Sequence, residues 1–190
     1  MEYRVDREAL LAELDGWNSF LKRKVHLIAC GGTALTLLGI KPSTKDIDFM
    51  VPNVDEYSYL IRTLIDLGYH SVTGSGLSRD GRFIFDLFRG NKIHTTELID
   101  TPLRDGGNIF YEEFTYIYVG ILNFYDLIIS KLFRGKQIDF DDCIMLIRAK
   151  PDEIDMDILK ERFLETASYD TSQDKVIRNM EIFFQIINKG

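Results

Sequence analysis

The sequence is poor in cysteine, proline and histidine, and each shortage excludes a class of protein. Its 190 residues include 2 cysteines, 4 prolines and 3 histidines. Cys30 and Cys143 form no CxxC pair, which argues against a disulfide-rich secreted fold and favours a reducing compartment. His26, His70 and His94 are scattered, without the spacing of zinc ligands.

Long basic runs and long apolar runs are also missing. The formal net charge is -7 and no basic stretch occurs, which argues against a broad surface for duplex nucleic acid. The most apolar later segment, residues 114–129, is interrupted by Asn123 and Asp126 and is too short to span a bilayer. The charged, amphipathic N-terminus is unlike a signal peptide. We therefore expect a cytoplasmic protein without a membrane partner.

The apolar pattern predicts an α/β core followed by a helical region. Strands are expected over residues 25–30, 46–51, 70–74, 82–90 and 114–122, and helices over residues 7–21, 33–39 and 53–68. Beyond residue 123, four segments have helical periodicity. The predicted fold is α/β (α+β), with a small mixed twisted sheet flanked by helices. The predicted domains are residues 1–122 and a C-terminal helical region, residues 123–190.

Two aspartates alternate with apolar residues in "DIDFMV", so Asp46 and Asp48 would leave one face of a strand about 6.5–7 Å apart. Two close carboxylates repel each other unless a cation lies between them. A third is expected on a neighbouring strand, and Asp86 is the one charged residue between Phe83 and Phe88. Such a set can hold two Mg²⁺ ions about 3.5–4 Å apart. The pattern therefore predicts a two-metal site, with Mn²⁺ as the alternative ion.

A glycine pair, Gly31-Gly32, separates the first expected strand from a helix beginning near Thr33. Without Cβ atoms, the pair allows positive φ and a close approach of phosphate oxygens to the backbone. A helix start also favours an anion. No GK[ST] follows the glycines, and a third glycine is misplaced for a dinucleotide fingerprint, so this is neither a P-loop nor a Rossmann motif. The pair predicts a phosphate-binding turn beside the metal site.

Together, "GGTALTLLGIKPSTKDIDFMV" resembles the glycine-pair and DxD signature of the nucleotidyltransferase superfamily with the DNA polymerase β-like fold. This stretch is similar in sequence to a small prokaryotic branch of the superfamily, which includes AbiEii-type toxins. The resemblance covers residues 26–88, and "DLIISKLFRGKQIDFDD" is similar to that branch's helix with a lysine and an arginine. The usual glycine-serine is glycine-glycine here, and no template-, primer- or tRNA-binding domain is recognisable.

The resemblance implies a Mg²⁺-dependent transfer of a nucleoside monophosphate from an NTP to an acceptor hydroxyl, with release of pyrophosphate. In the family, the first two aspartates bind both metals, and the third completes one metal site and helps to activate the hydroxyl. Carried over by position, the catalytic and metal-binding residues are Asp46, Asp48 and Asp86, and the nucleotide contacts are Gly31, Gly32, Thr33 and Lys131.

Plainer interpretations of these residues stay open. Asp46 and Asp48 could be a strand-entry and a solvent-facing carboxylate, and Asp86 an ion-pair partner of Arg82 or Arg89. Lys131 could be a lysine whose stem packs on a helix while its charge reaches solvent. Helix-linking ion pairs are the simplest role for three other residues: Arg134, Asp139 and Asp142.

Two other functions also stay open: a non-catalytic nucleotide-binding protein on the same fold, and a toxin–antitoxin-type interaction protein whose helical region binds an antitoxin-like partner. The sequence does not identify the acceptor, which could be tRNA, a protein or a small molecule, nor the preferred base.

Overall fold

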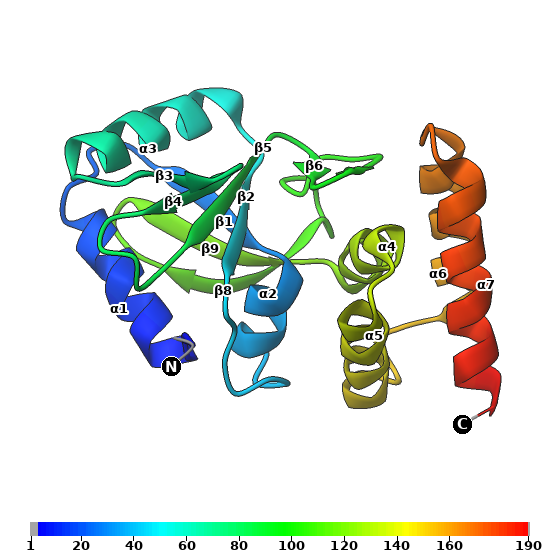
Figure 1. Cartoon of the computed structure of the whole chain (residues 1–190). Helices are drawn as coiled ribbons and strands as arrows, with labels where there is room; N and C mark the ends of the chain where they lie inside the picture. Colours follow the sequence, from blue (N-terminus) through cyan, green and yellow to red (C-terminus); the bar gives the residue numbers. More distant parts are fainter. Residues whose placement is uncertain (1–3, 190) are drawn as a thin grey trace. The chain divides into compact units, whose positions relative to one another are not determined.

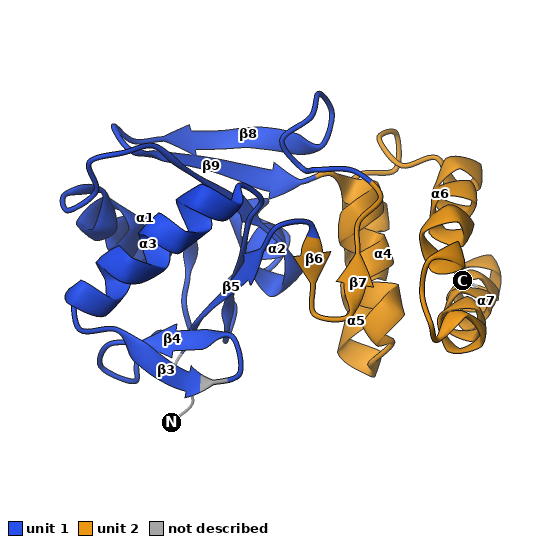
Figure 2. Ribbon diagram, turned by 90° about the horizontal axis from the view of Figure 1, so that it is seen from above, with its two compact units in different colours: residues 1–91, 100–122 blue, residues 92–99, 123–190 orange. Residues whose placement is uncertain are grey.

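The structure, a computed structural model, describes residues 4–189. It divides into two compact units (Figure 2): residues 1–91 with 100–122 form unit 1, and residues 92–99 with 123–190 form unit 2. The chain therefore passes from one unit to the other three times. The sequence did not indicate that residues 92–99 group with the C-terminal region.

Unit 1 is built on a mixed sheet (Figure 1). In chain order its elements are α1 (Arg7–Asn18), β1 (Val25–Ala29), α2 (Gly31–Leu37), β2 (Ile47–Val51), α3 (Val54–Asp66), β3 (His70–Thr73), β4 (Gly76–Ser78), β5 (Phe85–Arg89), β8 (Asn108–Glu113) and β9 (Ile117–Leu122). Within the described residues, seven strands lie in the order β3-β4-β5-β2-β1-β9-β8. The pairs β2–β5 and β1–β9 are parallel and the other pairs antiparallel. The predicted α/β class with a mixed sheet is confirmed.

Local sequence signals explain the helix boundaries of unit 1. The Asn53 side chain caps α3 by accepting hydrogen bonds from the backbone N–H groups of Asp55 and Glu56, and Gly68 follows the helix end with φ +90°. Helix α1 begins after Asp6, which caps it through the N–H of Ala9. Such caps are readable from sequence because their partners lie within three residues.

An aromatic cluster packs α1 onto the sheet. The Trp17 ring lies 4.5 Å from the ring centroid of Phe85 on β5 and meets Tyr69 edge-on at 5.8 Å. The indole N–H donates to the Tyr69 hydroxyl at 2.9 Å, and that hydroxyl donates to the Glu13 carboxylate. Burying a Trp with its N–H satisfied gives both apolar contact and orientation. The cluster fixes the strand next to β2.

The strands differ from the predicted ones in two ways. Strand β2 begins at Ile47, so Asp46 lies immediately before it, and β5 begins three residues later than expected. Strand β4 lies in a segment expected to be a turn, and β8 was not predicted either. The residues of β8 are exposed or half-buried on both faces because it forms one edge of the sheet, and the alternation that marks a half-buried strand is therefore missing.

Unit 2 consists of a short hairpin and four helices over its described residues. Its elements are β6 (Lys92–Ile93), β7 (Thr96–Glu97), α4 (Phe124–Arg134), α5 (Gln137–Ala149), α6 (Met156–Ser168) and α7 (Gln173–Lys189). No helix among residues 4–189 is both long enough and apolar enough to cross a membrane.

Buried ion pairs join the helices of unit 2. Lys131 on α4 contacts Asp142 on α5 at 2.8 Å, and both side chains are at most 5% exposed. Arg134 binds Asp139 through two nitrogens. Arg162 on α6 forms a bidentate pair with the buried Asp126, at 2.7 and 2.9 Å. The expected helix-linking role of Arg134, Asp139 and Asp142 is confirmed.

Candidate functional site

The parallel pair β2–β5 brings two aspartates together. Asp48 and Asp86 are direct partners in the strand register. Neighbouring strands lie about 4.8 Å apart, and registered residues leave the same face of a sheet. Ile47 and Phe49, on either side of Asp48, are fully buried on the other face, whereas both carboxylates are half-buried. The sequence predicted that Asp86 lies on a neighbouring strand, and the structure shows that it lies directly opposite Asp48.

A buried threonine fixes the backbone of the DxD segment. The Thr33 hydroxyl accepts a hydrogen bond from the N–H of Asp48 at 2.8 Å and donates to the carbonyl of Asp46 at 3.4 Å. The Thr44 hydroxyl donates to the same carbonyl at 2.9 Å. Thr33 is 0% exposed, so its hydroxyl positions the aspartates in this structure. A nucleotide contact by Thr33 stays a prediction.

The glycine pair makes room for neighbouring side chains. Gly31 has φ +56°, and a Cβ there would lie 2.9 Å from Cγ of Asp48 and closer still to its Oδ2. A Cβ on Gly32 would lie 2.6 Å from Oγ1 of Thr44. The N–H of Cys30 donates to the carbonyl of Asp48 at 3.1 Å and holds the same corner. Gly31 is therefore required by the Asp48 carboxylate, whatever else it binds.

A serine hydroxyl contacts the third predicted aspartate. The Oγ of Ser75 donates to Oδ1 of Asp86 at 2.8 Å. Ser75 is exposed and lies in the turn between β3 and β4, and the next residue, Gly76, is the register partner of Asp86. Sequence reasoning missed Ser75 because a serine in a turn carries no local signal. Its contact with Asp86 depends on the β4–β5 pairing.

The predicted acidic residues offer a metal ion a pair of carboxylates and not a larger cluster. No cluster of three or more His, Cys, Asp or Glu side chains within residues 4–189 is arranged to hold a metal ion. Asp48 and Asp86 nevertheless share one face, and the Asp48 carboxylate packs against the bare Gly31. Mg²⁺ is typically bound by one or two carboxylates together with waters and substrate phosphates. The pair fits Mg²⁺ on that basis, with Asp46 adjacent in sequence.

Lys131 belongs to unit 2, where it lies in the buried pair with Asp142. The neighbouring Cys143 is fully buried, and burial raises the pKa of its thiol, with the Lys131 charge as a smaller, opposing effect. A thiol held in this way is not a nucleophile at neutral pH. The role of Lys131 as a phosphate contact stays a prediction.

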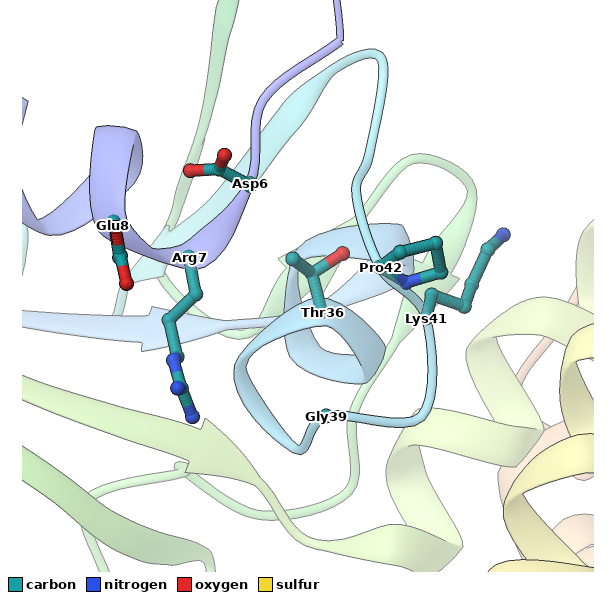
Figure 3. Close-up of a pocket in the computed structure, with 7 residues that line it drawn as sticks. All are labelled: Asp6, Arg7, Glu8, Thr36, Gly39, Lys41 and Pro42. Carbon is teal, nitrogen blue, oxygen red and sulfur yellow. The ribbon is translucent and has the colours of Figure 1, made fainter.

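Unit 1 also has a polar pocket of about 370 Å³ where α1 begins and α2 ends (Figure 3). Its lining carries charges of both signs and contains none of the predicted site residues: Asp6, Arg7, Glu8, Thr36, Gly39, Lys41 and Pro42. This mixture does not favour an anion or a cation. We assign no ligand to the pocket.

Comparison with solved structures identifies the fold. The crystal structure of ANT(2")-Ia in complex with adenylyl-2"-tobramycin aligns with a TM-score of 0.54, 14% identity, and coverage of 84% of this chain and 93% of that one. The chain has the nucleotidyltransferase fold. An antigenic nucleotidyltransferase-like protein from Paracoccidioides brasiliensis aligns with a TM-score of 0.42 and 13% identity, covering 93% of this chain and 95% of that one.

The family comparison concerns the C-terminal part of the chain. Residues 111–190 match the family described as nucleotidyltransferase of unknown function (DUF6036). No curated protein matches the sequence. The predicted nucleotidyltransferase fold is confirmed, the match of residues 111–190 agrees with the predicted superfamily, and the AbiEii-type branch stays a prediction.

Proposed function

We propose that this protein is a Mg²⁺-dependent nucleotidyltransferase that moves a nucleoside monophosphate from an NTP to an acceptor hydroxyl and releases pyrophosphate. One observation carries the proposal: Asp48 and Asp86 are register partners on parallel strands, and the Asp48 carboxylate lies against the bare Gly31. The fold and the match of residues 111–190 support the reaction class.

Each residue of this site has a distinct role in the proposal. Asp48 and Asp86, with Asp46, would hold the metal, which when bound neutralises charge on the attacking and leaving oxygens. Asp86 would accept the proton of the acceptor hydroxyl. The backbone at Gly31 would admit the triphosphate. Thr33 would keep both residues of the DxD segment in place through its two backbone hydrogen bonds.

Positioning and electrostatics supply most of the catalysis in such phosphoryl chemistry. In the proposed site, paired strands would position the aspartates, because these residues lie on or next to β2 and β5 and not on a long loop. The aligned ANT(2")-Ia complex holds an adenylyl group joined to tobramycin, which supports a hydroxyl-bearing acceptor for this fold. The acceptor here is left open among tRNA, protein and small molecules, and an antitoxin-like partner is compatible with each.

The test is transfer of label from each NTP, with Mg²⁺ or Mn²⁺, to total tRNA and to cell extract. Asp48→Asn should reduce transfer by about 10³-fold, since losing a metal ligand removes several kcal/mol of transition-state stabilisation. The matched control is Asp66→Asn, an exposed aspartate near the end of α3. Undiminished transfer by a folded Asp48→Asn protein would remove the metal assignment. NTP binding without pyrophosphate release in every mixture would favour a non-catalytic nucleotide-binding protein.

A further inference from the structure

The hydroxyl of Ser75 makes a contact with Asp86 that the proposed reaction requires of an acceptor hydroxyl. It donates to Oδ1 of Asp86 at 2.8 Å, and Asp86 is the carboxylate proposed to take the acceptor's proton. A nucleophile and its base are recognised by this contact, a hydroxyl within about 2.6–3.2 Å of the base. In protein kinases an aspartate accepts the substrate hydroxyl proton in the same manner.

Ser75 differs in this from other serines of the chain. Four other serine hydroxyls donate to backbone carbonyl oxygens of their own helix or of its last turn: Ser19, Ser58, Ser130 and Ser168. A hydroxyl that donates to a backbone carbonyl has no base to take its proton. The Ser75 hydroxyl donates to a carboxylate, and that carboxylate lies beside Asp48 in the strand register.

The surroundings of Ser75 suit a group that must be reached by a second molecule. Ser75 is exposed, and it lies between Gly74, which has φ +36°, and Gly76. Glycines on both sides lower the steric barrier to a change of backbone conformation. The pairing of Gly76 with Asp86 holds this turn beside the carboxylate.

We propose that Ser75 is itself an acceptor, so that the protein transfers a nucleoside monophosphate onto its own chain. This inference rests on the proposed function and names one acceptor for the same site. In the step, the Ser75 hydroxyl proton passes to the Asp86 carboxylate, Oγ forms a bond to the α-phosphorus of the NTP, and the bond from that phosphorus to the bridging oxygen breaks. The products are a phosphodiester at Ser75 and pyrophosphate.

The experiment incubates the full chain with each NTP and Mg²⁺, and then measures the intact mass and maps the modified peptide. We expect one added nucleotidyl group, on Ser75. Ser75→Ala should lose all of the incorporation, and Ser75→Thr, which keeps a hydroxyl, should retain part of it. Asp86→Asn should also abolish incorporation. The matched control is Ser71→Ala, an exposed serine on β3, which should incorporate as much as the wild type.

A second measurement needs neither nucleotide nor metal. Replacing Asp86 by Asn should move the ¹³Cβ resonance of Ser75 and leave that of Ser71 unchanged. An unmoved Ser75 resonance would overturn the inference, because the hydroxyl would then not rest on Asp86. Incorporation that persists in Ser75→Ala, or in Asp86→Asn, would overturn it as well.

The outcomes separate this inference from the function on which it rests. Label on an added acceptor with Ser75 unmodified would overturn self-modification and leave the nucleotidyltransferase proposal standing. No transfer to Ser75, to tRNA or to extract would overturn both.

Discussion

Aspartates are held differently in the two units. In unit 2, three buried aspartates are each bound by a cationic side chain: Asp126 by Arg162, Asp139 by Arg134 and Asp142 by Lys131. In the candidate site of unit 1, Asp48 and Asp86 are half-buried and lie beside each other in register, and Asp86 accepts a hydrogen bond from the uncharged hydroxyl of Ser75.

The difference separates two uses of one residue type. A buried carboxylate bound by Lys or Arg contributes to holding helices together. Two adjacent carboxylates of like charge raise each other's energy and are stabilised when a cation arrives. Arrangement, and not the number of acidic residues, therefore distinguishes a helix link from a candidate metal site.

The largest expected effect comes from breaking a buried pair of unit 2. Asp142→Ala leaves the Lys131 ammonium buried without its partner, so the free energy of unfolding should fall by about 3–5 kcal/mol. Denaturant unfolding measures this change. Asp141→Ala, at an exposed neighbour, should change stability by less than about 0.5 kcal/mol. A Lys131→Met/Asp142→Leu double variant should recover most of the loss, and equal losses in the Asp141 and Asp142 variants would contradict the comparison.

The next effect tests the space beside Asp48. In Gly31→Ala, the Cβ would displace the Asp48 carboxylate, and the positive φ would cost about 1–2 kcal/mol of stability. Nucleotide transfer should fall about 100-fold, because displacing a catalytic group by about 1 Å has an effect of that size. Gly39→Ala is the control: Gly39 has φ +74° and nothing within 4 Å of an added Cβ. Similar transfer by the two variants would show that the carboxylate does not need this space.

A pH titration tests another hydroxyl–carboxylate contact in unit 1. Burial, with the hydrogen bond to Glu13, raises the pKa of Tyr69 to about 12 from 10.0. Because the folded pKa is the higher one, the stabilisation is complete below about pH 10 and is lost as the pH rises through 12. We expect the free energy of unfolding to fall by about 1–2 kcal/mol over that interval, allowing for partial exposure. Tyr69→Phe should show a smaller fall, and parallel pH profiles would refute the assignment.

The smallest effect concerns the threonine behind the aspartates. Thr33→Val removes the acceptor for the Asp48 N–H and the donor to the Asp46 carbonyl, which should lower the free energy of unfolding by about 1 kcal/mol. Transfer should fall several-fold, since the DxD backbone loses its tether to α2. Thr33→Ser keeps the hydroxyl and should restore both quantities. A defect shared by the Val and Ser variants would point to packing instead.

Much of the fold could be predicted because its signals are local. The α3 cap at Asn53 and the glycine pair that begins α2 depend on residues a few positions apart. Strand β8 could not be recognised, because an edge strand exposed on both faces lacks alternation, and β6 and β7 are only two residues long. Their formation depends on partners that the local sequence does not specify.

The residues of the candidate site also fall into two groups, those with a local sequence signal and those whose contacts depend on tertiary structure. The spacing of Asp46 and Asp48 is a short-range pattern, and the metal site that it indicated on β2 stays a prediction. The buried partner of Lys131 lies eleven residues away on another helix, and Ser75 reaches Asp86 through strand pairing. Contacts of this kind depend on tertiary structure, which composition and periodicity do not encode.

The threefold passage of the chain between the units limits how the protein can be dissected. Cutting after residue 122 would separate residues 92–99 from the helices with which they group, so neither fragment would match a unit of the fold. Exchanging unit 2 between relatives would require transfer of two separate segments, residues 92–99 and 123–190. Selection on unit 2 would therefore also act on residues 92–99, which lie in the sequence between two parts of unit 1.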